Sequence, residues 1–71
     1  MRNLKKARES KKLSQENLAL LIGRTKPTIS RYENGQRDPS IEDLKKLCIA
    51  LDKSSDYLIG LIDDELKEDF K

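Results

Sequence analysis

The sequence lacks histidine and tryptophan altogether, and it holds one cysteine, two prolines and three glycines. Without histidine, no imidazole is available to act as a general base or to bind a metal ion. Cys48 has no disulfide partner within the chain, so we expect a buried thiol. No apolar run approaches the roughly 20 residues of a membrane span, and no apolar segment follows the basic N-terminus as in a secretory signal. These absences predict a cytoplasmic protein with no metal site, no cofactor and no membrane partner.

Charge, by contrast, is abundant and unevenly distributed. Charged residues make up 39% of the 71 residues. Residues 1–37 hold ten Lys and Arg against three Glu, a net charge of +7, whereas residues 62–71 hold two Lys against five acidic residues, a net charge of −3. A basic first half followed by an acidic end is typical of nucleic-acid binding, although a merely solvated basic face gives the same pattern. A chain of this length forms one small domain with a marginal core, which favours oligomerisation.

The apolar residues recur with the period of helices rather than strands. Ser14, Thr25 and Ser40 suit helix N-caps, and Gly23 suits a left-handed C-cap. Asp43, three residues after Ser40, stands in a capping-box position. The apolar residues of the fourth expected helix form one stripe, which consists of Ile41, Leu44, Leu47, Cys48 and Leu51. Pro27 is tolerated as the second residue of its helix, because first-turn N–H groups have no acceptor within the helix. The expected helices cover residues 3–12, 15–22, 26–33, 41–51 and about 54–60, and the spacing of Ile62, Leu66 and Phe70 permits a short sixth helix.

The second and third of these helices are separated by three residues around one glycine. This is helix-turn-helix spacing, in which the second helix of the pair can enter the major groove of DNA. The sequence therefore predicts an all-α domain over residues 1–61, followed by an acidic amphipathic extension over residues 62–71.

Motifs along the chain carry a family resemblance. LSQ-x-x-LA spans residues 13–19, TIS-x-YENG spans 28–35, PS follows at 39–40, L-x-x-L-x-x-AL spans 44–51, and DYL-x-G spans 56–60. With these motifs the chain resembles the phage-repressor and Cro-like helix-turn-helix family, often called the xenobiotic-response-element type, from Leu4 through Gly60. The resemblance implies a compact five-helix, lambda-repressor-like domain that binds DNA.

In that family the third helix contacts the bases. The matching residues are Lys26, Pro27 and Thr28 at its N-terminal end and Arg31 one turn later. Arg31 can pair bidentately with guanine O6 and N7, Lys26 can reach the same acceptors, and Thr28 can contact a base edge, a phosphate or a thymine methyl. Pro27 departs from the polar residue often found there, and it either contacts a thymine methyl or only stiffens the start of the helix.

The resemblance also implies contacts with the DNA backbone. Gln15 matches a phosphate-binding position at the start of the second helix, where free N–H groups suit an anion. Ser14 can divide its hydroxyl between capping and phosphate binding. Plain solvent-exposed side chains remain the alternative for all of these positions. The other expected phosphate contacts are Arg24, Thr25, Asn34 and Arg37.

Other positions are interpreted structurally. Similar proteins pair an Arg of the first helix with the Glu of the YENG stretch, which implies an ion pair between Arg8 and Glu33. Asp52 and Lys53 stand where the family often has Gly and Val. Leu20 and Leu21 replace residues that are often polar, so they either add packing or expose a surface to a partner.

We expect a homodimer on an inverted repeat of double-stranded operator DNA, because one small domain binds weakly and half-sites lie roughly 34 Å apart. The expected interface is C-terminal, with a frayed end at residues 62–71 as the alternative. Its residues are Tyr57, Leu58, Leu61, Ile62, Leu66 and Phe70.

The sequence thus predicts a sequence-specific transcriptional repressor of bacterial or phage type, controlled by its own concentration, by proteolysis or by a protein partner. A protein-interaction module of the same fold, such as an antitoxin or a partner of another regulator, is the alternative. An enzyme is not expected, because no nucleophile lies beside a base and no glycine loop suits a phosphate.

Overall fold

The computed structural model describes residues 1–62, and these residues form five α-helices and no strand. The expected all-α, five-helix architecture is therefore confirmed. The sixth helix and most of the C-terminal extension fall on residues 63–71, outside the described part of the chain. No helix in the described part is long and apolar enough to cross a membrane. The helices are α1 (Leu4–Ser10), α2 (Gln15–Ile22), α3 (Lys26–Glu33), α4 (Ile41–Leu51) and α5 (Ser55–Ile59).

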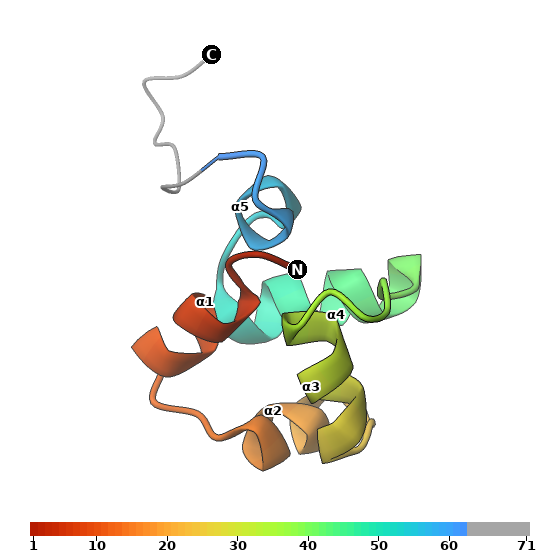
Figure 1. Ribbon diagram of the computed structural model, residues 1–71. Coiled ribbons are helices and arrows are strands. Elements are labelled where there is room, and N and C mark those ends of the chain that lie inside the picture. Colours follow the sequence, from red (N-terminus) through yellow and green to blue (C-terminus); the bar gives the residue numbers. More distant parts are fainter. Residues whose placement is uncertain (63–71) are drawn as a thin grey trace.

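The helices are arranged around α4, which contacts α2 on one side and α5 on the other (Figure 1). The α2–α3 pair forms one end of the molecule, and α5 lies at the opposite end. The N-terminal segment runs beside α5, where the side-chain amide nitrogen of Asn3 donates hydrogen bonds to the carbonyl oxygens of Tyr57 (2.8 Å) and Ile62 (3.3 Å). These bonds join the two ends of the described chain.

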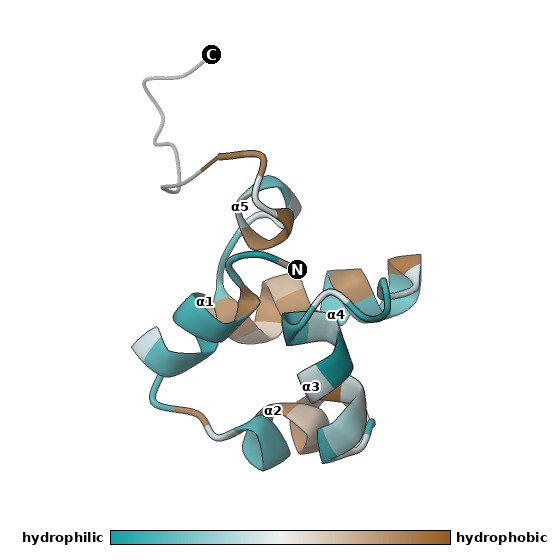
Figure 2. Cartoon of the chain, in the orientation of Figure 1, coloured by the Kyte–Doolittle hydropathy of each residue, from teal (hydrophilic) through white to brown (hydrophobic). Residues whose placement is uncertain are grey.

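The hydrophobic core draws on all five helices (Figure 2). Each helix turns one apolar face inward, as the helical period of the sequence predicts, and most charged residues lie outside. The exceptions are Arg8, Glu33 and Asp43, whose side chains are buried. From α3, only two apolar side chains, Ile29 and Tyr32, enter the core. The fully or almost fully buried apolar residues are Leu4, Ala7, Leu18, Ala19, Ile22, Ile29, Tyr32, Leu47, Leu51, Tyr57 and Leu58.

The ends of the helices follow the local signals closely. The hydroxyl groups of Ser14, Ser40 and Ser54 accept hydrogen bonds from backbone N–H groups three residues later, at 2.9, 3.0 and 3.1 Å. Gly23 ends α2 in the left-handed conformation, with φ of 72°. Thr25 occupies the predicted N-cap position of α3, but its hydroxyl lies 3.2 Å from the hydroxyl of Thr28 and makes no backbone cap.

Three expectations about burial or helix length need correction, and one open alternative is decided. Cys48, expected to be a buried thiol, is only half-buried. The first helix ends at Ser10, two residues before the expected Lys12. Ile41, placed in the buried stripe of the fourth helix, is 71% exposed. Leu20 and Leu21 are 73% and 60% exposed, so neither is core packing in the isolated chain. The errors in burial have one origin, because helical period places residues on a face but does not say how much of that face the neighbouring helices cover.

The structure also contradicts part of the predicted dimer interface. Tyr57 and Leu58 are buried in the core of their own chain, so they are not available to a second copy. Leu61 is exposed and Ile62 is half-buried against the core, while Leu66 and Phe70 lie outside the described residues. The tyrosine and the leucine of the DYL-x-G motif thus belong to the hydrophobic core of their own chain.

The C-terminal end of α4 carries backbone strain. Asp52 adopts the left-handed conformation there, with φ of 55° and ψ of 47°, at the position where glycine is usual. A side chain with a β-carbon pays a conformational penalty in this region that glycine does not.

We expect Asp52→Gly to raise the free energy of unfolding by about 0.5–1 kcal/mol, because it removes this strain. Chemical denaturation monitored by circular dichroism measures the change. Gly23→Ala is the matched control in the opposite direction, because it adds a β-carbon to a left-handed residue. That β-carbon meets no atom within 4 Å. It should destabilise the fold through backbone strain alone. A destabilised Asp52→Gly variant would show that the Asp52 side chain has a stabilising role.

Candidate nucleic-acid interface

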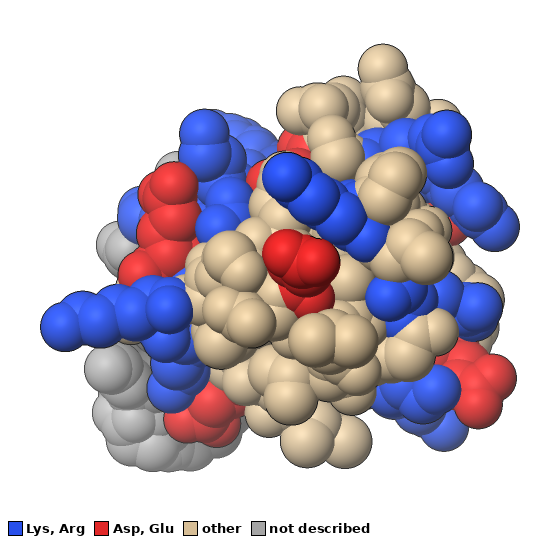
Figure 3. All heavy atoms as spheres, turned by 90° about the horizontal axis from the view of Figure 1, so that it is seen from below, with Lys and Arg blue, Asp and Glu red and all other residues tan. Residues whose placement is uncertain are grey.

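The outer side of α3 presents the residues expected to contact bases. Lys26, Pro27 and Arg31 are exposed and Thr28 is half-buried, whereas Ile29 and Tyr32 on the other side of the helix are buried. Pro27 lies in the first turn, where its missing N–H costs no helical hydrogen bond. The helix therefore exposes basic and hydroxyl groups to solvent on one side, while its other side is packed against the core. Seen from the end formed by α2 and α3, Lys and Arg side chains lie along the left, upper and right sides of this face, and an acidic side chain lies near its centre (Figure 3).

A buried ion pair connects α1 with the end of α3. Nε of Arg8 lies 2.6 Å from Oε2 of Glu33, and the two side chains are only 10% and 4% exposed. Nη1 of Arg8 also donates to the carbonyl oxygen of Leu13, at 2.8 Å. The pair expected from the family resemblance is thus present. Since both charges are desolvated, removing one partner typically costs about 3–5 kcal/mol, although the pair itself adds little net stability.

Glu33 has a second partner that the sequence did not indicate. Its Oε1 accepts a hydrogen bond from the side-chain amide nitrogen of Gln15, at 2.9 Å. Gln15 is the first residue of α2, so this bond fixes the expected phosphate-binding side chain beside the free N–H groups of that helix end. One amide hydrogen of Gln15 is used by Glu33, and the other is left for an acceptor.

A second buried carboxylate lies at the other end of α2. Asp43, in the first turn of α4, is 1% exposed. Its Oδ2 accepts hydrogen bonds from Nε of Arg24, at 2.8 Å, and from the hydroxyl of Tyr32, at 2.7 Å. The sequence pattern predicted a capping box for Ser40 and Asp43. Only the serine half forms, because the carboxylate points into the protein and binds Arg24 and Tyr32 instead.

This cluster shifts the ionisation of its members. The hydrogen bond from Arg24 holds the pKa of Asp43 below its ordinary value of 3.8, against the opposing effect of burial. Burial, reinforced by the hydrogen bond to Asp43, raises the pKa of Tyr32 above its ordinary value of 10.0. Asp43 therefore stays ionised and Tyr32 stays a hydroxyl donor at neutral pH.

The remaining expected phosphate contacts flank α3. Arg24 and Thr25 precede the helix, Asn34 and Arg37 follow it, and all four are exposed residues. The side-chain nitrogen of Asn34 lies 3.4 Å from the hydroxyl of Ser30. Ser14 is also exposed, but its hydroxyl is engaged as the α2 cap. The fold thus places donors near both ends of α3, and their contacts with phosphate remain predictions.

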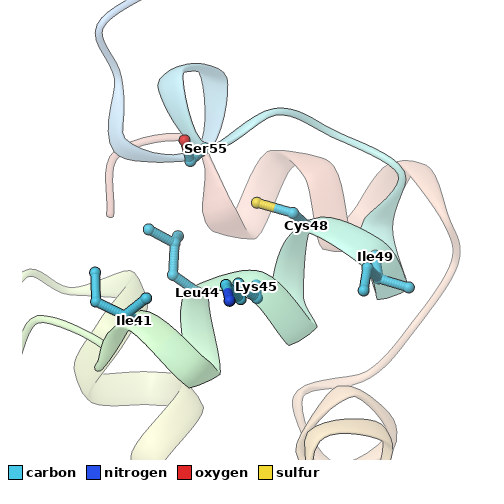
Figure 4. A pocket seen from close by; sticks show the side chains of 6 residues that line it. All are labelled: Ile41, Leu44, Lys45, Cys48, Ile49 and Ser55. Carbon is cyan, nitrogen blue, oxygen red and sulfur yellow. The ribbon is translucent and has the colours of Figure 1, made fainter.

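Other surfaces of the described residues offer less chemistry. A shallow groove of about 360 Å³ on α4 is lined mainly by apolar side chains (Figure 4). No group of three or more Cys, Asp or Glu side chains within residues 1–62 is arranged to hold a metal ion. The groove residues are Ile41, Leu44, Lys45, Cys48, Ile49 and Ser55.

Two short helices joined at a left-handed glycine, with a polar second helix seated on a five-helix core, define a helix-turn-helix protein. Comparison with known sequences agrees, since the family model described as Helix-turn-helix matches residues 4–58. The chain therefore belongs to the Cro/C1-type helix-turn-helix family.

Relatives of known sequence or structure support the same family. The chain is 46% identical over 57 residues to the uncharacterized HTH-type transcriptional regulator YqaE of Bacillus subtilis. The matched segment covers 80% of this chain and 49% of YqaE. It thus spans about half the length of that relative. The P22 c2 repressor, solved with a synthetic operator, superposes with a TM-score of 0.75 at 32% identity, over 79% of this chain and 85% of that one. The N-terminal DNA-binding domain of SinR from Bacillus subtilis gives 0.72 at 33% identity, over 93% and 91%.

The lowered pKa of Asp43 predicts an acid-sensitive contribution to stability. A carboxyl group with a depressed folded-state pKa stabilises the fold above its unfolded pKa, and this stabilisation is lost as the pH falls through the folded value. We therefore expect Asp43→Asn to be less stable than the wild type at neutral pH, and the two to converge below about pH 4. Melting temperatures measured from pH 7 to pH 2 test this.

Glu42→Gln, which removes a neighbouring exposed carboxylate, controls for the loss of one negative charge. A constant difference between Asp43→Asn and the wild type over the whole pH range would show that ionisation of Asp43 does not contribute to stability.

Proposed function

We propose that this chain binds double-stranded DNA sequence-specifically by placing α3 in the major groove, and that it acts as a transcriptional repressor. The observation that carries the proposal is the division of α3 into a buried side, Ile29 and Tyr32, and an exposed side that offers Lys26, Thr28 and Arg31. Side chains of these types are the ones that bond base edges in the major groove.

The flanking donors support the same placement. Gln15 lies at the start of α2, beside N–H groups that have no acceptor within the helix, and Arg24 and Arg37 lie on either side of α3 in the chain. Phosphate contacts at both ends of a recognition helix fix its register in the groove. The operator-bound repressor among the structural relatives supports this use of the fold. Blocking a promoter requires only such binding, so repression is the simplest consequence.

Dimerisation follows from the small reach of one domain. An eight-residue helix is about 12 Å long and covers only a few base pairs, and the whole described chain has a longest dimension of 36 Å. Two copies on half-sites roughly 34 Å apart would double the contacts and recognise a palindrome. We propose a homodimer through the end of α5, where Leu61 is exposed and Ile62 is half-buried.

A protein-interaction role is the second candidate, because apolar side chains are exposed away from α3. Leu21 and Ile49 border a shallow groove between α2 and α4 that also includes Lys46 and Ala50. Such a surface suits a protein partner better than DNA. The two roles separate experimentally, since only the first depends on the exposed side of α3.

For the recognition helix, we expect Arg31→Ala to lose the preference for one base in each half-site, at a cost of about 1–3 kcal/mol in discrimination. Selection of sites from a random duplex pool, followed by binding measurements on the selected and mutated sites, measures this. Lys53→Ala removes the same charge beside the ring of Tyr57 on α5, the helix at the end of the molecule opposite α2 and α3, and should keep the full preference. Unselective binding by the wild-type protein would refute sequence-specific recognition.

For the dimer, we expect Leu61→Asp to shift the protein to a monomer in sedimentation experiments and to weaken binding to a palindromic site. A charge buried at the interface would be desolvated without a partner. Ile49→Asp places the same charge on α4, at a residue that is 82% exposed, and should leave the dimer intact. The reverse result would place the interface on α4, and a monomeric wild type would exclude the homodimer.

A further inference from the structure

A buried carboxylate beneath the helix-turn-helix belongs to neither of its helices. Asp43 lies on α4, yet its Oδ2 binds both Arg24, in the turn between α2 and α3, and Tyr32, near the end of α3. The backbone N–H of Asp43 is held in turn by the hydroxyl of Ser40, at 3.0 Å. One oxygen atom thus joins the turn, the recognition helix and the central helix of the fold.

The pairing with Arg24 is single rather than bidentate. Only Nε of Arg24 reaches the carboxylate, and Oδ1 of Asp43 has no hydrogen-bond partner among the described residues. The Arg24 side chain remains 45% exposed, although its carboxylate partner is buried. A two-point contact would satisfy both oxygens and would stabilise the pair more. The observed geometry instead uses one nitrogen of the guanidinium and leaves its two terminal nitrogens without a partner in residues 1–62.

The same arrangement occurs at the other end of α2. There the buried carboxylate of Glu33 holds one hydrogen of the Gln15 amide and leaves the other for an acceptor. In both places a buried acid holds a donor on the helix-turn-helix, the half-buried Gln15 in one case and the exposed Arg24 in the other. The two donors lie at opposite ends of α2, since Gln15 is its first residue and Arg24 follows its last residue by two positions.

We infer that Asp43 is a positioning residue for DNA binding: it fixes Arg24 through Nε so that the terminal guanidinium nitrogens bind a backbone phosphate. The inference rests on the proposed function and adds a residue that touches no DNA. The central helix α4 thereby sets the orientation of a phosphate contact that the turn itself leaves unconstrained.

The negative charge of Asp43 allows a positioning role to be distinguished from a general electrostatic effect. Removing a carboxylate from a DNA-binding protein makes its field more positive and, by long-range electrostatics alone, strengthens binding. If Asp43 positions Arg24, its removal weakens binding instead. The sign of the effect therefore separates positioning from bulk charge.

The test compares five proteins with the wild type on a duplex chosen by site selection, at several salt concentrations. They are Arg24→Ala, Arg24→Lys, Asp43→Asn, the double variant Arg24→Ala with Asp43→Asn, and the control Glu42→Gln. Thermal unfolding first establishes a temperature at which each variant is folded, and binding is measured there. Arg24→Lys keeps the charge but lacks the planar fork that can bind a carboxylate and a phosphate together.

We expect Arg24→Ala to weaken binding about tenfold and to reduce the slope of log affinity against log salt by about 0.9, the loss of one phosphate contact. Asp43→Asn should weaken binding in the same direction, and the double variant should bind no more weakly than Arg24→Ala alone. Arg24→Lys should bind more weakly than the wild type despite its equal charge. Glu42→Gln should bind as tightly as the wild type or more tightly.

Several results would overturn the inference. If Asp43→Asn binds DNA as tightly as Glu42→Gln, Asp43 supports the fold only. If the losses in Arg24→Ala and Asp43→Asn add in the double variant, the two residues act independently. A wild-type protein that binds no DNA would refute the proposed function and this inference together. A wild type that binds normally, with Arg24→Ala unchanged, would refute this inference alone.

Discussion

The burial and hydrogen bonding of Tyr32 are the constraint on which the rest of this small fold depends. Its ring is buried with Ile29 as half of the apolar anchor of α3, its hydroxyl donates to Asp43, and its carbonyl oxygen accepts from the N-terminal ammonium at 2.6 Å. A polar helix of eight residues cannot hold its place by burial alone, since only two of its side chains reach the core. The directional bonds of Tyr32 add what burial lacks, because they fix the rotation of the helix as well as its position.

Two buried carboxylates extend this constraint to the surface. Glu33 follows Tyr32 directly and pairs with Arg8, while Asp43 binds the tyrosine hydroxyl. Each acid also holds a side chain on the edge of the helix-turn-helix, Gln15 in one case and Arg24 in the other. Buried charges are costly in so small a core, and apolar residues would often stabilise it as well. What the carboxylates add is direction, since they hold the donors Gln15 and Arg24 at defined places at the two ends of α2.

The apolar residues at the surface lie away from the exposed side of α3. The exposed side of α3, which the proposed function assigns to DNA, contains basic and hydroxyl groups, whereas exposed leucines and isoleucines lie on α2, α4 and α5 and beyond α5. A surface that is to bind an anionic polymer and a surface that is to bind apolar groups need opposite solvation, so the proposed function explains why the two are separate. This separation is compatible with a second copy or another protein binding without covering α3.

What the sequence by itself determined is what short-range chemistry controls. Ser14, Ser40, Gly23 and Pro27 act within a few residues of their own position, so the helix ends and the helix-turn-helix spacing were predictable. The family motifs added the Arg8–Glu33 pair, which no local rule implies. Tertiary structure alone decided the partners of Asp43, the burial of Tyr57 and Leu58, and the exposure of Ile41. Arg24 and Asp43 are 19 residues apart, and a spacing rule within α4 assigned Asp43 to a local cap. Which of two possible partners a carboxylate takes depends on how α4 packs against α2 and α3, and that packing is a property of the whole fold.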